Sequence, residues 1–83
     1  MSVYDPLQAF LSRQSAPEII LTFEEIGRLI GQPLPQSART YDAFWANEEA
    51  PKTRHNHCRA WRNAGYKVRT DRLAEIALFY KAT

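Results

Sequence analysis

The sequence predicts a small α+β domain in which helices and short strands share one core. Its 83 residues fit a single domain. The composition, with 45% hydrophobic and 12% aromatic residues, is that of a globular chain and excludes a disordered one. Several segments carry apolar residues at helical spacing after a capping residue. Others carry the β-branched or alternating pattern of strands.

The first helix is expected to begin at Asp5, because Asp is a good N-cap and Pro6 is tolerated at the first helical position. The helical pattern ends at 15–17. Residues 18–22, Glu-Ile-Ile-Leu-Thr, are rich in β-branched side chains and predict a strand. The apolar face of the helix is formed by Leu7, Phe10 and Leu11.

A capping box opens the second helix, since Thr22 is a hydroxyl N-cap and Glu25 stands three residues later. Gly31 is placed to end this helix in a left-handed conformation. The prolines in 32–35 cannot continue it. Its apolar face is expected at Phe23, Ile26, Leu29 and Ile30.

A third helix is expected over 37–47, with Ser37 as its cap and Asn47 at its end. The segment 48–52, which contains Pro51, is the clearest loop of the chain. The apolar residues at helical spacing in the third helix are Ala38, Tyr41, Phe44 and Trp45.

A fourth helix is expected from Thr53 or Arg54 to Ala64, with Gly65 as its stop. After it, 66–69 alternates apolar and polar residues, and 74–80 is mostly apolar. Residues 70–72 can turn the chain between them, so the C-terminal part predicts a β-hairpin.

The resulting order is helix, strand, helix, helix, helix and hairpin. With one helix removed, this is the order of a winged-helix domain, so the predicted fold is a winged-helix-like α+β domain with four helices, one short early strand and a C-terminal hairpin. The extra helix leaves open whether 37–47 or 54–64 takes the place of the recognition helix.

Several phrases of the sequence resemble a small bacterial domain family of unknown function. They are Tyr-Asp-Pro-Leu at 4–7, Leu-Thr-Phe-Glu-Glu-Ile at 21–26, Leu-Pro-Gln-Ser-Ala-Arg at 34–39, Phe-Trp-Ala-Asn at 44–47 and Ala-Trp-Arg-Asn-Ala-Gly-Tyr at 60–66. The resemblance covers nearly the whole chain. A Phe stands at position 44 where that family often has a second Trp. The resemblance implies one domain and no particular activity.

Charge is distributed unevenly along the chain, although the net charge is only +2. Residues 1–36 carry two basic and four acidic side chains. Residues 52–72 carry seven Lys and Arg against Asp71 alone, a local excess of +6. Such an excess favours a polyanion such as nucleic acid, and a solvated basic surface is the alternative.

The fourth helix carries the predicted base contacts. At 100° per residue, Asn56, Arg59 and Asn63 share the side opposite Cys58 and Trp61. Asn and Arg are the residues that pair bidentately with adenine and guanine in the major groove. Arg54 and Arg62 are expected to neutralise phosphates. A polar solvent-facing side is the alternative, because every amphipathic helix has one.

Three further basic residues are candidates for phosphate contacts. Arg39 follows Ser37 at the start of the third helix, where a phosphate is favoured; the alternative is an ion pair with an acid such as Asp42 or Glu24. Lys67 and Arg69 lie on the hairpin, where a basic wing contacts the DNA backbone or minor groove. A charged edge strand that resists pairing is the alternative for these two.

The sequence predicts no catalysis, no cofactor and no metal site. His55 and His57 project about 200° apart on one helix and cannot share a metal. Cys58 has no partners for nucleophilic catalysis and is expected in the core with Trp45 and Trp61. Paired carboxylates and Gly-rich phosphate loops are also missing from the sequence.

The function expected from these residues is that of a regulatory module that binds double-stranded DNA. One module has a small footprint, so a homodimer or a fused partner protein is expected. A protein-interaction domain with a basic patch for an acidic partner is the alternative. The single cysteine and the absence of any apolar run near 20 residues predict a cytoplasmic protein without a membrane span.

Overall fold

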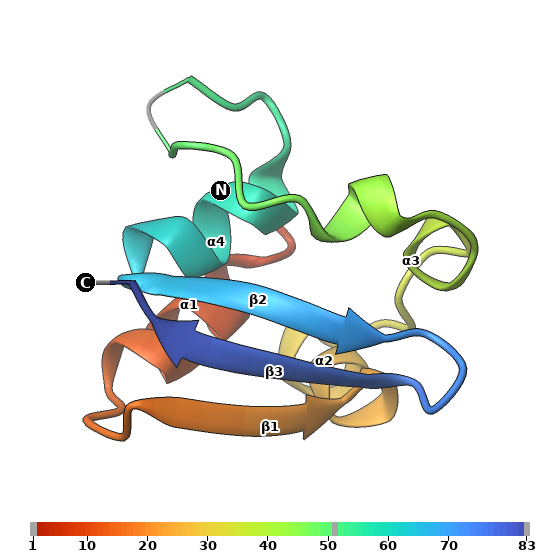
Figure 1. Cartoon of the computed structure of the whole chain (residues 1–83), viewed down its shortest axis with the longest axis horizontal. Helices are drawn as coiled ribbons and strands as arrows, with labels where there is room; N and C mark the ends of the chain where they lie inside the picture. The colour runs from red at the N-terminus through yellow and green to blue at the C-terminus, as the bar shows by residue number, and fades with distance from the viewer. Residues whose placement is uncertain (1, 51, 83) are drawn as a thin grey trace.

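A three-stranded antiparallel sheet forms one layer of the protein, and helices cover one of its faces (Figure 1). The computed structural model describes residues 2–50 and 52–82. The strands are β1 (Glu18–Thr22), β2 (Tyr66–Asp71) and β3 (Ile76–Lys81), in the spatial order β1-β3-β2. The helices are α1 (Asp5–Ser12), α2 (Phe23–Ile30), α3 (Ser37–Thr40) and α4 (Asn56–Asn63), with a 3₁₀ helix η1 (Asp42–Trp45) between the last two.

The α+β class with four helices is confirmed, but the layout of the strands is corrected. The early strand does not stand apart from the hairpin, because β1 pairs antiparallel with β3, placing Ile20 opposite Leu78. On the other edge of β3, Arg69 of β2 lies opposite the same Leu78. The apolar strand β3 therefore has its backbone groups paired on both sides, as a central strand requires.

Helix α1 begins at Asp5 as expected, but its N-cap is Tyr4 and no side chain caps it, so the expected capping by Asp5 is wrong. Helix α2 begins and ends as its capping residues predict. Thr22 Oγ1 accepts a hydrogen bond from the backbone N–H of Glu25 at 3.0 Å. The Glu25 carboxylate accepts one from the N–H of Thr22 at 2.8 Å, which completes the capping box. Gly31 ends α2 at φ 82°, a left-handed conformation that favours glycine.

The predicted third helix over 37–47 is wrong as a continuous element. The chain forms α3 and η1 instead, and Tyr41 between them is extended at φ −124° and ψ 128°. Tyr41 was expected on the apolar face but is 61% exposed. The break lets the Trp45 indole N–H donate to the carbonyl oxygen of Ala38 at 2.8 Å, so a buried polar atom is satisfied.

The fourth helix begins at Asn56, two or three residues after the expected start at Thr53 or Arg54. The backbone N–H of His55 donates to Thr53 Oγ1 at 3.0 Å, which holds the residues before Asn56 in a turn. The hairpin turn is also displaced, because the strands extend to Asp71 and begin again at Ile76. In that turn the Asp71 carboxylate accepts the N–H of Ala74 at 3.1 Å.

Aromatic rings join the helices to the sheet. Trp45 stacks on Phe23 of α2, with ring centroids 5.1 Å apart, and on Trp61 of α4 at 5.7 Å. Trp61 in turn lies 6.0 Å from Phe79 of β3. Both tryptophans are buried, as expected for core residues.

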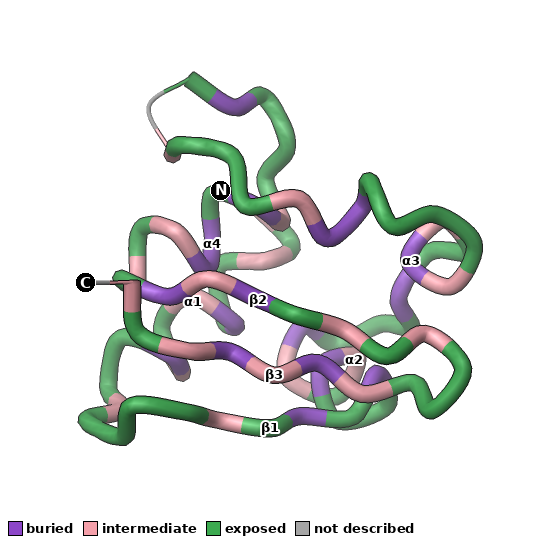
Figure 2. The backbone as a smooth tube through the Cα atoms, in the orientation of Figure 1, coloured by how far each residue is buried: buried purple, intermediate pink, exposed green. Residues whose placement is uncertain are grey.

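No helix formed by residues 2–50 or 52–82 covers the other face of the sheet (Figure 2). Ile20 of β1 is 64% exposed there. No helix among the described residues has the length and apolar character needed to cross a bilayer. We call this the outer sheet face, and by the strand register it carries Glu18, Ile20, Thr22, Lys67, Arg69, Asp71, Ile76, Leu78 and Tyr80.

Asn47 fastens the segment after η1 to the edge of the sheet. Its side-chain amide donates to the carbonyl oxygen of Val68 at 3.0 Å and accepts the N–H of Val68 at 2.8 Å. The sequence suggested only a helix stop at this residue. Its amide instead pairs with edge strand β2 as the backbone of a neighbouring strand would.

We predict that Trp61→Ala lowers the free energy of unfolding by about 3–5 kcal/mol, because Trp61 is 1% exposed and its loss leaves a cavity in the aromatic core. Urea unfolding followed by circular dichroism measures the change. Leu73→Ala, at a residue that is 100% exposed, serves as the control and should change stability by less than about 0.5 kcal/mol. A loss below about 1 kcal/mol for Trp61→Ala would contradict its core role.

We predict that Asn47→Ala costs about 1–3 kcal/mol, because it leaves both backbone groups of Val68 without their partner. The same unfolding experiment applies, with Asn63→Ala on the exposed side of α4 as the control. Equal stability of the two variants would show that water replaces the amide at no cost.

Candidate nucleic-acid interface

Helix α4 exposes the row of residues expected to contact bases. Asn56, Arg59 and Asn63 are all exposed, as the helical spacing predicts, and Arg62 is half-buried beside them. The other side of the helix packs against α1 and β2. Its buried residues are Cys58, Ala60 and Trp61.

Arg59 also makes a contact within the fold. Its guanidinium donates to the carbonyl oxygen of Thr53, in the turn before α4. Asn56 and Arg59 line a shallow hollow together with Ser2, Asp5 and Gln8. A guanidinium has five N–H donors, so Arg59 retains donors for a ligand while its position is fixed.

The structure does not bring the hairpin residues onto the same surface as α4. Lys67 and Arg69 belong to the outer sheet face, whereas α4 packs on the opposite face. The guanidinium carbon of Arg69 lies 5.5 Å from the ring centroid of Tyr80. The expected wing and the expected recognition helix therefore point in different directions.

Arg39 is separate from both groups, and its half-buried side chain is held by contacts within the fold. Its Nε lies 3.2 Å from the Glu75 carboxylate, and its guanidinium lies over the ring of Phe23 at 5.7 Å. The ion-pair alternative named Asp42 or Glu24 as partner, but the acid is Glu75, and Asp42 pairs with Arg72 at 2.7 Å. Arg39 joins α3 to the hairpin turn, so a phosphate there would compete with this ion pair.

Ion pairing within the described residues leaves five basic residues of the segment 52–72 without acidic partners, as well as Arg13 and Lys81 outside it. The pairs found among the described residues are Arg28–Glu24, Arg39–Glu75, Lys52–Glu49, His55–Glu48 and Arg72–Asp42. Lys52 and Arg72, at the two ends of the basic segment 52–72, are thus neutralised. Within residues 2–50 and 52–82, the members of that segment with no acidic partner are Arg54, Arg59, Arg62, Lys67 and Arg69.

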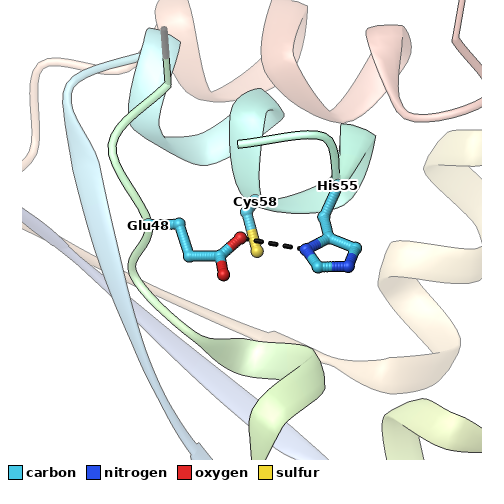
Figure 3. Close-up of side chains that lie close together, drawn as sticks. All are labelled: Glu48, His55 and Cys58. Carbon is cyan, nitrogen blue, oxygen red and sulfur yellow. Dashed lines mark hydrogen bonds and ion pairs between the residues drawn. The ribbon is translucent and has the colours of Figure 1, made fainter. Parts of the chain in front are cut away.

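A second cluster lies where the loop after η1 meets the start of α4 (Figure 3). Glu48 Oε1 lies 2.9 Å from His55 Nδ1 and accepts a hydrogen bond from the Thr53 hydroxyl. The Cys58 thiol points toward the same place, and the ligand atoms of Glu48, His55 and Cys58 all lie within 4.8 Å of one another. These three side chains therefore face one point.

The charge states of this cluster follow from its contacts. Hydrogen bonds from His55 and Thr53 hold the pKa of Glu48 below its usual value. Burial, with the nearby Glu48 charge, raises the pKa of the Cys58 thiol to about 11. The carboxylate is therefore ionised at neutral pH while the thiol keeps its proton.

The sequence did not predict this cluster, because the two histidines considered together as metal ligands were His55 and His57. The local signal was His55 and Cys58, which are three residues apart and so share one side of a helix. Glu48 comes from the loop, and its approach depends on tertiary contacts such as that of Asn47 with β2.

His57 lies between the cluster and the aromatic core. Its ring stacks on Phe44 with centroids 3.8 Å apart and lies 5.6 Å from Tyr4. Burial, with the neighbouring His55, lowers the pKa of His57 to about 4. The folded protein therefore keeps this imidazole neutral at pH values where the unfolded chain protonates it.

We predict that stability falls as the pH is lowered from about 6.5 to about 4, because in this window the unfolded state takes up a proton at His57 that the folded state does not. Urea unfolding at several pH values measures the slope. His57→Phe keeps an aromatic ring on Phe44 and should flatten the slope in this window. Glu18→Gln, at an exposed residue of β1, serves as the control and should leave the slope nearly unchanged. An unchanged slope in His57→Phe would assign the loss to other groups.

Comparison with known proteins places the chain in a family. The model of one family, a domain of unknown function (DUF7662), matches residues 4–83. No curated protein and no solved structure matches the chain. The resemblance to a family of unknown function is thereby confirmed at that level. Because the match extends over nearly the whole sequence, the chain belongs to the DUF7662 family of domains of unknown function.

Proposed function

We propose that this domain binds double-stranded DNA through the exposed side of α4. The observation that carries the proposal is the group of basic residues without acidic partners, which begins at Arg54 and continues along α4. Arg28, Arg39, Lys52 and Arg72 are paired with carboxylates, whereas the basic residues outside this group that have no ion pair among the described residues are Arg13, Lys67, Arg69 and Lys81. Positive charge that the fold leaves uncompensated on one helix favours a polyanion.

The side chains of α4 divide into two roles in this proposal. Asn56, Arg59 and Asn63 form the exposed row and are of the types that read base edges. Arg54 precedes the helix, and Arg62 flanks the row, so these two would contact phosphates.

Of the winged-helix arrangement, the proposal keeps the recognition helix, and α4 takes that place. The alternative segment 37–47 forms two short helices of four residues each. Neither presents a continuous helical face to a groove, whereas α4 has eight residues and an exposed polar side. Lys67 and Arg69 point away from that side, so the expected role of the hairpin as a wing is withdrawn from the proposal.

A single copy would cover little DNA. Eight residues of α-helix are about 12 Å long, which corresponds to roughly three to four base pairs. Regulatory specificity would therefore require a homodimer or a partner protein fused to or associated with this domain.

We predict that the full chain binds duplex DNA at about 50 mM salt, with affinity that falls steeply as salt rises. Fluorescence anisotropy with labelled genomic fragments measures binding, and circular dichroism checks that each variant is folded. Arg54→Ala should weaken all sequences alike and reduce the salt slope by about one unit. Arg59→Ala should weaken the preferred fragment by about 1–3 kcal/mol and random DNA much less.

Arg69→Ala is the matched control, because it removes an equal charge from the outer sheet face. It should leave both affinities nearly unchanged. Loss of binding in Arg69→Ala with none in Arg54→Ala would move the interface to the sheet. No binding by the unaltered chain at low salt would refute the proposed function.

A protein-interaction domain is the second candidate, and the outer sheet face favours it. Ile20 is 64% exposed, and Arg69 lies beside the ring of Tyr80 on the same face. The apolar area beside Lys67 and Arg69 suits acidic groups of a protein partner, and Glu18 and Asp71 on the same face would meet basic groups of that partner. Such a partner would be sensitive to Arg69→Ala and insensitive to Arg54→Ala, the reverse of the DNA proposal.

A further inference from the structure

The cluster of Glu48, His55 and Cys58 combines three different metal-binding groups. One carboxylate, one imidazole and one thiol direct their ligand atoms to a common point, within 4.8 Å of one another (Figure 3). In a tetrahedral zinc site with bonds of 2.0–2.3 Å, ligand atoms lie roughly 3.2–3.8 Å apart. The 2.9 Å between Glu48 Oε1 and His55 Nδ1 is slightly shorter than this range. Side-chain movements of about an ångström would therefore create a zinc site.

We propose that Glu48, His55 and Cys58 bind one Zn²⁺ ion at the junction of the loop and α4. The mixture of oxygen, nitrogen and sulfur ligands is one that Zn²⁺ accepts and that Mg²⁺ and Ca²⁺ do not. Three protein ligands leave a fourth position for water. That position adjoins a surface hollow lined by Glu48, Lys52, Thr53, Arg54 and His55.

The charges of the three ligands suit a dication. The Glu48 carboxylate and a Cys58 thiolate supply two negative charges, and His55 binds as the neutral imidazole, so the complex with Zn²⁺ has no net charge. Zn²⁺ would take the place of the hydrogen bond between His55 Nδ1 and Glu48, the neutral imidazole would carry its proton on Nε2, and the Cys58 proton would leave to solvent. Without a metal the buried thiol donates a long hydrogen bond to the Phe44 carbonyl oxygen, at 3.9 Å.

Surrounding residues already orient the ligands. The Thr53 hydroxyl donates a hydrogen bond to the Glu48 carboxylate, and Thr53 is itself buried, with 5% of its surface exposed. Hydrogen bonds of this kind fix ligand orientation around metal ions. Cys58 is held in place because it lies on the buried side of α4, next to Trp61.

The test uses the full chain, freed of metal by a chelator and kept reduced with a phosphine. Co²⁺ is the spectroscopic probe, because its bond to a thiolate gives a near-ultraviolet charge-transfer band and its tetrahedral complexes absorb strongly in the visible. We expect both signals to saturate at one Co²⁺ per chain and to disappear when Zn²⁺ displaces the cobalt. Zn²⁺ should also raise the Tm, because it binds the folded state.

Variants assign the ligands. Cys58→Ser should abolish the charge-transfer band, and Glu48→Gln and His55→Gln should each weaken Co²⁺ binding at least about tenfold. Glu49→Gln is the matched control, because Glu49 is the adjacent acid and pairs with Lys52 instead. Its affinity should equal that of the unaltered chain.

Three results would overturn the proposal. One is the absence of a charge-transfer band in the folded, reduced chain at millimolar Co²⁺. Another is a band whose affinity is the same in Glu48→Gln as in the unaltered chain. The third is saturation at one Co²⁺ per two chains, which would place the metal between cysteines of two copies.

Discussion

The stacking of Trp45 between Phe23 and Trp61 is the contact on which the rest of the structure depends. It joins α2, η1 and α4, and Trp61 extends it to Phe79 in the central strand. The chain can place Trp45 there only because the helix expected over 37–47 is interrupted at Tyr41, so that the indole N–H reaches the carbonyl of Ala38. The interruption costs helical hydrogen bonds, which the burial of the large aromatic rings offsets.

Local signals in the sequence were sufficient for the elements that local chemistry determines. Thr22 and Glu25 form a capping box, and Gly31 ends α2, because both devices involve residues within one turn. Tyr41 shows the limit of this reasoning. It stands at helical spacing in the sequence, but the chain is extended there because the burial of Trp45 outweighs the local helical preference. The pairing of β1 with β3 joins residues more than fifty positions apart, and no local pattern specifies it.

In the candidate site, too, local sequence patterns predicted some residues correctly, whereas the positions of others depend on the whole fold. Helical periodicity placed Asn56, Arg59 and Asn63 on one exposed side because the spacing of α4 alone decides it. Strand periodicity puts Lys67 and Arg69 on one side of β2, but which side the helices cover depends on the whole fold. The approach of Glu48 to His55 and Cys58 depends in the same way on how the loop after η1 is attached.

Asn47 has a consequence for how copies of this domain behave beside one another. A sheet edge with free N–H and C=O groups is a template onto which a strand of another molecule can add. On the β2 edge the amide of Asn47 bonds both backbone groups of Val68. An incoming strand therefore cannot form hydrogen bonds with the residue in the middle of β2. The opposite edge is only five residues of β1, beginning directly after Pro17. One loop side chain thus limits sheet-to-sheet polymerisation of a domain whose outer sheet face is partly apolar.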